Sequence, residues 1–368
     1  MSNKIYDCAI IGGGVAGLTL SIQMANLGYK TILFEKNKYP FHKVCGEYVS
    51  NECYDFLKRL GIKLDEMNLP FIDEVKITSP KGYFFHEKLD LGGFGISRYK
   101  LDYELFKKAL ESGVEVFDGT KVNDVEKNDN YKITTKEDIF YSKIVCGSFG
   151  KHAQHFLKSK NEGDFLAVKY HIKTDFPNNL VELNNFYNGY CGISKIENDE
   201  YCMCYLTTVE NLKNSNNNIK EMEKNILYKN KNLKKYFNEA EFLYDKPVTI
   251  SQIYFGKRKT SSSNIILLGD SAGTIAPLFG NGMSIAMRAS FELSKRLDKY
   301  LKNIISFKQL EYEYENVFNN MFLSRINRSI FLQKIFGKKY MTDLIIAFLS
   351  KNTYITKKLI AKSHGDIF

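Results

Sequence analysis

Three glycines near the start of the chain have the spacing Gly12-x-Gly14-x-x-Gly17, and an acidic residue, Glu35, follows. Gly12 permits a tight turn, Gly14 has no side chain to keep a phosphate from the backbone, and Gly17 lets a helix lie close on a sheet. The amides and dipole of that helix N-terminus would face a pyrophosphate. A carboxylate at position 35 can accept both hydroxyls of a ribose and disfavours a 2′-phosphate. The pattern predicts a cradle for FAD or NAD rather than NADP.

A second group of residues with chemical potential lies some 250 residues later. The apolar run 265–268 ends at Gly269-Asp270, and a Gly-rich turn then leads into a helix. An acid at a strand end can take a ribityl hydroxyl. A helix N-terminus offers amides to the N1–C2=O edge of a flavin, where negative charge accumulates on reduction. This second motif therefore favours FAD, and the turn residues expected to bind it are Gly280, Asn281, Gly282 and Met283.

The elements around the first motif occur in the order that this chemistry needs. A buried strand is predicted at 5–11, a helix at 15–27 and a second strand at 31–34, which ends at Glu35. Ala16, in the first turn of the helix, and Lys36, beside Glu35, are further expected cofactor contacts. Strand, turn, helix, strand and acid in register are much more specific than the three glycines alone.

The remaining chain predicts an α/β fold with a Rossmann-like FAD domain, an inserted antiparallel-sheet substrate domain and C-terminal helices. The apolar periodicity is near two between 165 and 208, which indicates antiparallel sheet, and helical beyond 305. Aromatic residues on those strands, which are Phe186, Tyr187, Tyr190, Tyr201 and Tyr205, are expected to form a substrate wall over the flavin, although they could also only fill a core. The predicted domains are 1–70, 95–155 and 245–300 for FAD, 72–95 and 160–245 for the substrate, and 301–368 for the helical segment.

Two shorter pieces resemble a known group of flavoproteins. Lys43-Val44-Cys45-Gly46-Glu47 resembles the loop after the first βαβ unit in geranylgeranyl reductases and flavin-dependent halogenases, and Ser97-Arg98-x-x-Leu101-Asp102 resembles their Arg-containing helix start. With the two glycine motifs, the chain from about 5 to 300 resembles the glutathione-reductase-type FAD fold, in the superfamily that also includes para-hydroxybenzoate hydroxylase. The resemblance implies that Lys43, Cys45 and Arg98 contact FAD. Arg98 could instead be a surface charge.

Departures from the superfamily pattern bear on the reaction. Phe149 stands where many hydroxylases carry an acid tied to FAD and NADPH, which puts the usual NADPH mode in doubt. Ala272-Gly273 resembles the reductase branch, where many hydroxylases have Ala-His. The chain contains no tryptophan, so the WxWxIP signature of flavin halogenases is absent and halogenation is not expected.

The resemblance leaves three functions open. The leading one is an FAD-dependent oxidoreductase of the geranylgeranyl reductase branch, with hydride transfer through flavin N5. The second is a monooxygenase that hydroxylates or epoxidises through a flavin C4a-hydroperoxide, and the third is a non-catalytic flavin- or lipid-binding protein. The electrons would come from NAD(P)H, a separate flavin reductase or a ferredoxin. No catalytic residue is assigned; Cys45, as a packing or redox-active thiol, is the one candidate near the ring.

Polar groups suited to binding the carboxylate of a small acid are scarce in the predicted substrate domain. No arginine occurs between Arg98 and Arg258, and the pattern places Lys169 and Lys195 on outward faces of their strands. His171 is expected to be a structural histidine. A largely apolar substrate, free or linked to a carrier, therefore follows.

The formal net charge is +10, and the tail 331–368 carries seven lysines against Asp343 and Asp366. The tail is either a solvated surface or a contact for an anionic partner, such as an acidic carrier protein or a membrane surface. No nucleic-acid reader motif is recognisable. The seven cysteines fit neither a disulfide framework nor a metal site, and Cys202 and Cys204 share one face of a strand. With no apolar signal core and no membrane-length apolar run, a cytoplasmic protein is expected.

Overall fold

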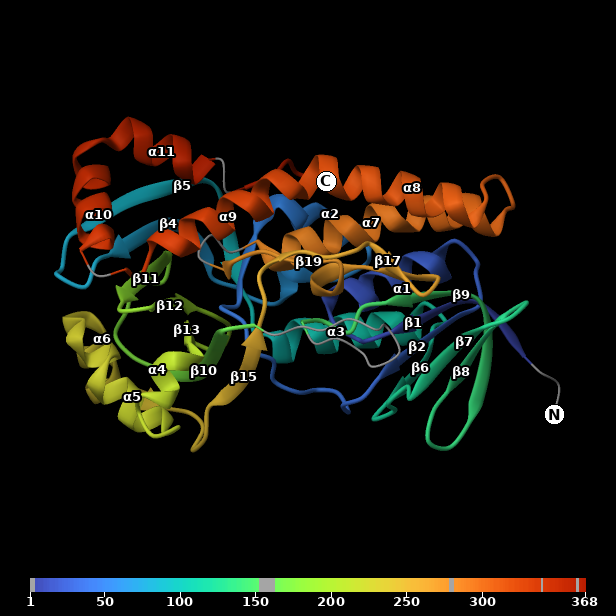
Figure 1. Ribbon diagram of the computed structural model, residues 1–368, viewed down its shortest axis with the longest axis horizontal. Helices are drawn as coiled ribbons and strands as arrows, with labels where there is room; N and C mark the ends of the chain where they lie inside the picture. Colours follow the sequence, from blue (N-terminus) through green and yellow to red (C-terminus); the bar gives the residue numbers. More distant parts are fainter. Residues whose placement is uncertain (1–3, 152–162, 278–280, 339, 362–363) are drawn as a thin grey trace.

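The computed structural model describes residues 4–151, 163–277, 281–338, 340–361 and 364–368. Two sheets lie side by side along the longest axis, with long helices over both (Figure 1). The first sheet has the strand order β17-β18-β9-β1-β2-β6, and the second has the order β14-β10-β13-β12-β11-β4-β5-β3. The fold is α/β with parallel and antiparallel sheets and C-terminal helices, as the sequence predicted.

The first sheet is parallel at its centre, where β1 pairs with β2 and β9 and β9 pairs with β18. β1 is buried along nearly its whole length, as expected for a central strand covered on both faces. A hairpin of β7 and β8 extends the sheet from β9. The bounds are β1 (Ile5–Ile11), β2 (Thr31–Glu35), β6 (Glu115–Asp118), β7 (Asp124–Lys127), β8 (Tyr131–Thr134), β9 (Ile139–Gly147), β17 (Ser261–Ser262) and β18 (Ile265–Leu267).

Helices α1 (Val15–Asn26), α3 (Arg98–Glu111) and α7 (Gly282–Leu301) cover this sheet, with α1 packed against both of the others. Small residues allow α1 and α7 to approach closely, and Thr19 Oγ1 lies 2.8 Å from Ser290 Oγ between them. The glycine motif before α1 and the Gly-rich turn before α7 are therefore brought to the same end of the sheet, although 270 positions separate Gly12 from Gly282.

The second sheet combines strands from two distant stretches of sequence. β4 pairs parallel with β11, so the strands near 72–95 lie in the same sheet as those from 165 onwards. α4 (Val209–Lys213), α5 (Ile219–Asn225) and α6 (Lys231–Glu239) cover one face. The strands are β3 (Tyr48–Ser50), β4 (Phe71–Thr78), β5 (Phe84–Gly95), β10 (Phe165–Lys173), β11 (Leu180–Phe186), β12 (Gly189–Lys195), β13 (Tyr201–Thr208), β14 (Glu241–Phe242) and β15 (Val248–Ile253).

The last helices divide between the two sheets. α8 (Phe307–Phe318) packs on α7, and a π-helical turn, Asn319–Leu323, leads into α9 (Ser324–Ile335). α10 (Met341–Lys351) and α11 (Thr353–Ala361) then fold back over β5. Ile346, Leu349 and Ile360 share a core with β4 and β5. Among the described residues, no helix is both long and apolar enough to span a bilayer.

Smaller elements connect these layers. After β3 the chain forms a 3₁₀ turn (Asn51–Cys53) and then α2 (Tyr54–Arg59). The strand pair β16 (Gly256–Lys257) and β19 (Gly273–Thr274) lies beneath α9. The division into domains stays a prediction. The structure nevertheless adds one fact to it, because α10 and α11 pack on the second sheet.

Candidate functional site

The turn between β1 and α1 is a concave cradle. Gly12 has a φ of +108°, and an added Cβ would lie 2.3 Å from the carbonyl oxygen of Ser148. At Gly14 an added Cβ would meet only the ends of Lys43 and Arg98, each 3.8 Å away. The first turn of α1 carries no acidic residue, and no side chain caps its N-terminus. The cradle therefore offers free backbone amides and two cations to a phosphate group.

Gly17 has a different part in the same turn. An added Cβ there would lie 2.0 Å from the carbonyl oxygen of Gly12. Gly17 therefore lets α1 pack closely, and it does not line the cavity described below, whereas Gly12, Gly14 and Ala16 do.

Glu35 ends β2 with its carboxylate buried. Oε2 accepts from the backbone amide of Gly13 at 2.9 Å, and Oε1 accepts from the backbone amide and the side-chain amide of Asn37 at 3.1 and 3.0 Å. An ionised carboxylate has about four acceptor sites, so hydroxyl groups can still bind to the oriented group. Lys36 is exposed and lines the same cavity as Glu35.

Lys43 and Arg98 share one buried carboxylate. Arg98 binds Asp102 through two bonds, Nε–Oδ1 at 2.7 Å and Nη2–Oδ2 at 2.8 Å, and Lys43 Nζ lies 3.1 Å from Oδ2. Burial alone would raise the pKa of Asp102, but Arg98 and then Lys43 lower it below its ordinary value. The Arg98 side chain is only 13% exposed, so it is not a surface charge. Lys43 Nζ also lies 3.9 Å from Glu35 Oε2, and the ends of both cations face Gly14.

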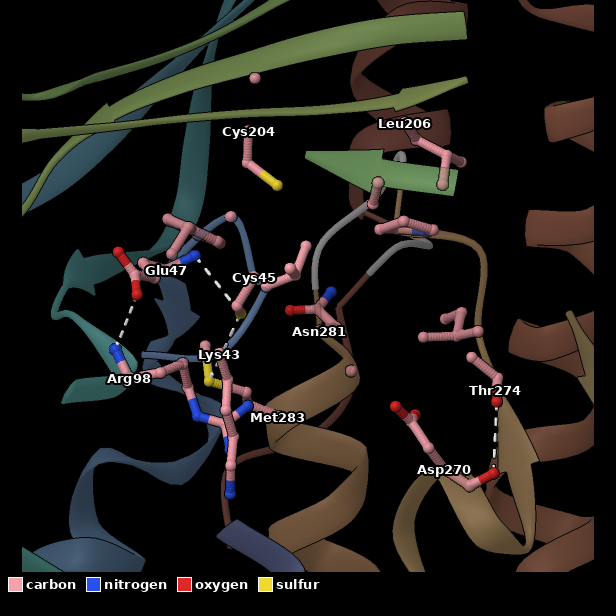
Figure 2. A pocket seen from close by; sticks show the side chains of 18 of the residues that line it. Lys43, Cys45, Glu47, Arg98, Cys204, Leu206, Asp270, Thr274, Asn281 and Met283 are labelled. Atoms are coloured by element: carbon pink, nitrogen blue, oxygen red, sulfur yellow. Dashed lines mark hydrogen bonds between the residues drawn. The ribbon is translucent and has the colours of Figure 1, made fainter. Parts of the chain in front are cut away.

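The loop after the cradle carries Cys45 into the cavity. Cys45 Sγ lies 4.0 Å from Met283 Sδ and accepts from the amide of Glu47 at 3.4 Å. Figure 2 shows Cys204 pointing from β13 towards this loop. Burial raises the pKa of the Cys204 thiol to about 12, so it is a neutral thiol near pH 7. Cys45, Met283 and Cys204 all line the cavity.

The second motif closes the cavity from the other side. β18 ends at Leu267, and Gly269 follows with a φ of +62°. The Asp270 side chain extends into the space between the elements, while its backbone carbonyl accepts from Thr274 Oγ1 at 3.2 Å (Figure 2). Asn281, with a φ of +69°, precedes α7, whose first turn from Gly282 contains no acid. Gly280 lies outside the described residues.

Glu47 is the centre of a buried network that the sequence did not predict. Its carboxylate, fully buried, accepts from Lys169 Nζ at 2.7 Å, from the amide of Arg98 at 2.8 Å, and lies 2.6 Å from His171 Nε2. Burial opposes the charge, but Lys169 and His171 lower the pKa of Glu47 to about 2. The expectation that Lys169 points outward is wrong, because its side chain is fully buried against Glu47. Lys169 and His171 at i and i+2 on one strand were the signal that both face the same side.

Three of these groups come close enough together to resemble a metal site. Among the described residues, the ligand atoms of Glu47, His171 and Cys202 lie within 4.8 Å of one another. Both Glu47 oxygens already have partners, and the buried ammonium of Lys169 would repel a cation at that point. Burial also raises the pKa of Cys202 well above its ordinary value, which disfavours the thiolate that a metal needs. The network therefore ties the loop of Cys45 and Glu47 to β10.

All of these features border one cavity of about 1090 Å³. It contains thirteen of the fifteen residues predicted to bind the cofactor: Gly12, Gly14, Ala16, Glu35, Lys36, Lys43, Cys45, Arg98, Gly269, Asp270, Asn281, Gly282 and Met283. Beyond the cradle its lining becomes apolar. The second sheet contributes Val75, Ile77, Phe85, Leu183, Leu206 and Ile250, and the C-terminal helices contribute Leu332, Phe336, Phe348, Leu349, Leu359 and Ile360.

The aromatic wall expected on the second sheet is largely wrong. Phe186 and Tyr201 belong to the core shared with α4–α6, and Tyr187 is half exposed. Tyr205 borders the cavity, but its hydroxyl donates to Glu223 on the helix side at 2.8 Å. The strands alternate, so aliphatic residues and Tyr190 face the cavity instead. The sequence identified the strands, but it did not show which face the helices would cover.

No family model matches the chain. Conditioned medium factor receptor 1 of Dictyostelium discoideum is 24% identical to it over 380 residues, which cover 90% of this chain and 71% of that protein. Digeranylgeranylglycerophospholipid reductase 3 of Methanosphaera stadtmanae is 22% identical over 98% of this chain and 95% of its own length. A chlorinase of Pseudomonas fluorescens that acts on 1H-pyrrole-2-carbonyl-(peptidyl-carrier protein) is 22% identical over 87% of this chain and 82% of its own length.

Solved structures show the same fold. The flavin-dependent brominase Bmp2 matches with a TM-score of 0.80 at 17% identity, over 98% of this chain and 93% of that one. A geranylgeranyl bacteriochlorophyll reductase-like protein from Thermoplasma acidophilum matches with a TM-score of 0.77 at 17% identity, over 99% and 97%.

Fold, cradle and sequence matches together define a class, that of FAD-dependent oxidoreductases. Within it, the chain is similar to flavin-dependent halogenases and geranylgeranyl reductases, the proteins that the sequence motifs predicted. The missing tryptophan signature made halogenation unexpected, and flavin-dependent halogenases are nevertheless among the proteins that the chain resembles over most of its length.

The residues present fit FAD. Gly14 leaves room for a pyrophosphate beside Lys43 and Arg98, and two helix N-termini without acidic residues converge on the same cavity. Bound there, FAD would supply hydride and electron chemistry, and the protein would bind and orient it.

Proposed function

We propose that the protein is an FAD-dependent reductase that delivers a hydride through the flavin to a largely apolar chain. The cavity supports this proposal, because it continues from the cofactor cradle into a space walled by aliphatic side chains of the second sheet and of α9–α11. Its volume of about 1090 Å³ exceeds the roughly 300–1,000 Å³ usual for a site with one ligand. A cofactor and a second, apolar molecule can therefore bind side by side.

Each cofactor residue has a task in this proposal. Gly14, Lys43 and Arg98 hold the pyrophosphate, and Glu35 accepts from the ribose hydroxyls. Asp270 accepts from a ribityl hydroxyl, and the first amides of α7 face the edge of the flavin on which charge accumulates. The Glu47–Lys169–His171 network holds the loop of Cys45 in position. The aliphatic wall excludes water and orients the substrate.

The electron donor follows from a departure in the sequence. Phe149 lines the cavity, at the position where many hydroxylases of the superfamily carry an acid. We therefore propose that electrons come from a donor bound in another way: NAD(P)H in a different pose, a flavin reductase or a ferredoxin.

Halogenation is the second candidate. It is supported by the TM-score of 0.80 to the brominase and by the likeness to the chlorinase over 87% of the chain. The same cavity would then hold an apolar aromatic or carrier-linked acceptor. Monooxygenation needs the same cofactor and the same cavity, so the two oxygen-dependent reactions are separated from reduction by their products.

The test begins with the flavin reduced by dithionite without oxygen and mixed with a geranylgeranyl-bearing glycerophospholipid. Reoxidation of the flavin together with a product heavier by two hydrogens supports the reductase. A product formed only with oxygen and bromide, with a bromine isotope pattern, supports halogenation, and an added oxygen atom supports monooxygenation; either result would overturn the reductase.

A matched pair of variants ties the reaction to the cavity. Leu206→Trp puts a bulky ring into the apolar part, so it should lower turnover at least tenfold while the flavin spectrum is unchanged. Tyr312→Ser, on exposed α8, should change neither. Full activity in Leu206→Trp would show that the substrate does not use this space.

A further inference from the structure

The outer face of the last two helices is unusually apolar. On α10, Met341, Leu344 and Phe348 stand at helical spacing and are 47%, 71% and 54% exposed. On α11, Tyr354, Ile355 and Leu359 are exposed as well. The opposite side of α10 is buried, through Ile346 and Leu349, so this helix carries apolar side chains on both sides but is covered on one side only. We call these six exposed side chains the α10–α11 face.

The α10–α11 face surrounds an opening of the cavity. Phe348, Ile355 and Leu359 are exposed to solvent and also line the cavity that reaches the cofactor cradle. Figure 1 places α10 and α11 at the end of the molecule opposite the N-terminus, over β4 and β5. An apolar molecule that reached this face could therefore enter the cavity without crossing water.

Exposed lysines border the face, while Asp90 and Asp366 lie near Lys357 towards the C-terminal end of α11. Lys351, Lys357 and Lys358 are exposed on or beside the same helices, and Lys358 Nζ lies 6.0 Å from the Tyr354 ring. The one acid between 341 and 361, Asp343, is buried and accepts from the amide of Lys81 at 3.1 Å. Apolar side chains bordered by lysines and a tyrosine are the pattern of helices that lie in the surface of an anionic lipid bilayer.

We propose that the α10–α11 face docks the protein on an anionic membrane surface and that its apolar substrate enters from the lipid. An acidic protein would pair with the lysines but would leave the six apolar side chains without a matching partner, whereas a bilayer satisfies both. The second half of this proposal rests on the apolar substrate argued above, but the docking can be tested without any turnover.

The experiment measures binding of the FAD-loaded protein to vesicles by flotation. Vesicles of phosphatidylcholine with phosphatidylglycerol should bind it, and vesicles of phosphatidylcholine alone should bind it much more weakly. Leu344→Ser with Tyr354→Ser should lower the partition coefficient roughly a hundredfold through lost apolar burial. Lys351→Gln with Lys358→Gln should lower it roughly 25-fold on the anionic vesicles only, about a factor of five for each lysine.

Matched variants elsewhere keep the test specific. Ile304→Ser with Tyr312→Ser removes equally exposed apolar groups from another surface, and Lys136→Gln with Lys308→Gln removes two exposed charges. Neither pair should change binding. No binding to anionic vesicles, or equal losses in the control pairs, would overturn the docking. A concentration-dependent dimer that Leu344→Ser with Tyr354→Ser dissolves would also overturn it and assign the face to a second copy.

The outcome can be separated from that of the proposed function. Vesicle binding with no reduction of a dispersed apolar substrate would leave the docking intact and refute the reductase. Reduction of a detergent-dispersed substrate without vesicle binding would support the reductase and refute the docking.

Discussion

The cofactor cradle and the apolar wall opposite it border the same cavity but are assembled differently. The first half of the cradle comes from residues 12–47, in which a strand, a turn and a helix follow directly on one another. The wall draws single side chains from β4, β5, β11, β13, β15 and α9–α11. Local backbone geometry determines the first half of the cradle, which therefore tolerates few substitutions. Packing of distant elements determines the apolar wall, so the shape of the wall can change with little effect on the cofactor site.

The largest effect on the cradle is expected from a substitution at Gly14. Gly14→Val should fold, because the nearest atoms are two flexible cationic side chains 3.8 Å away, but it should lose FAD, since the added side chain occupies the place of the pyrophosphate. Flavin absorbance and the unfolding midpoint of the apoprotein measure the two effects. Gly17→Val should instead unfold the chain, since its Cβ would overlap the carbonyl oxygen of Gly12. A yellow Gly14→Val protein would refute the cradle.

The Glu47 network, which joins the two regions, gives the next largest effect. Glu47→Gln leaves the buried ammonium of Lys169 without its anion and should lower the free energy of unfolding by about 3–5 kcal/mol. The double variant Glu47→Gln with Lys169→Met should recover a large part of the lost free energy of unfolding, as measured by urea denaturation. Glu66→Gln, which breaks the exposed pair with Lys63, should cost about 1 kcal/mol or less. Equal losses of unfolding free energy in the single and double variants would show that the Glu47–Lys169 charge pair does not account for the stability.

Asp270 tests the half of the cradle that comes from the distant motif. Asp270→Ala should weaken FAD binding by about 2 kcal/mol, the loss expected for a charge-assisted hydrogen bond. Titration of the apoprotein with FAD measures it, with Asp366→Ala, on the exposed tail, as the control. Unchanged affinity would show that the carboxylate does not contact the cofactor.

The smallest effect concerns pH. Burial, then Lys169 and His171, lower the pKa of His42 to about 4 from an ordinary value of 6.5. The unfolded chain then binds a proton more readily than the folded one, so stability is fully present above pH 6.5 and falls as the pH drops towards 4. Glu47, with a pKa of about 2, adds a further loss below pH 4.5. Burial lowers the pKa of His364 as well, so His42→Phe should reduce the loss of stability between pH 6.5 and 4 without removing it, and should keep the loss below pH 4.5. Unfolding midpoints measured as a function of pH check this.

Much of the fold could be predicted because its signals are local. The strand expected at 5–11 is β1 (Ile5–Ile11), and the helix expected after the Gly-rich turn is α7 (Gly282–Leu301). The glycines, Glu35 and Asp270 could be identified because a nucleotide constrains backbone shape and charge within a few consecutive residues. The fold class and the superfamily followed from these motifs, and the comparisons confirmed both.

Tertiary structure alone decided the rest. Period-two alternation shows that a strand has two faces, but only the packing of α4–α6 against one of them determined that Phe186 and Tyr201 are core residues and that Leu206 faces the cavity. Lys169 looked exposed because its partner, Glu47, lies 122 positions away in sequence. The tail looked like a basic surface, whereas α10 and α11 also roof the cavity with apolar side chains. In each case, the free energy depends on contacts between segments that are far apart in sequence, which neither composition nor periodicity records.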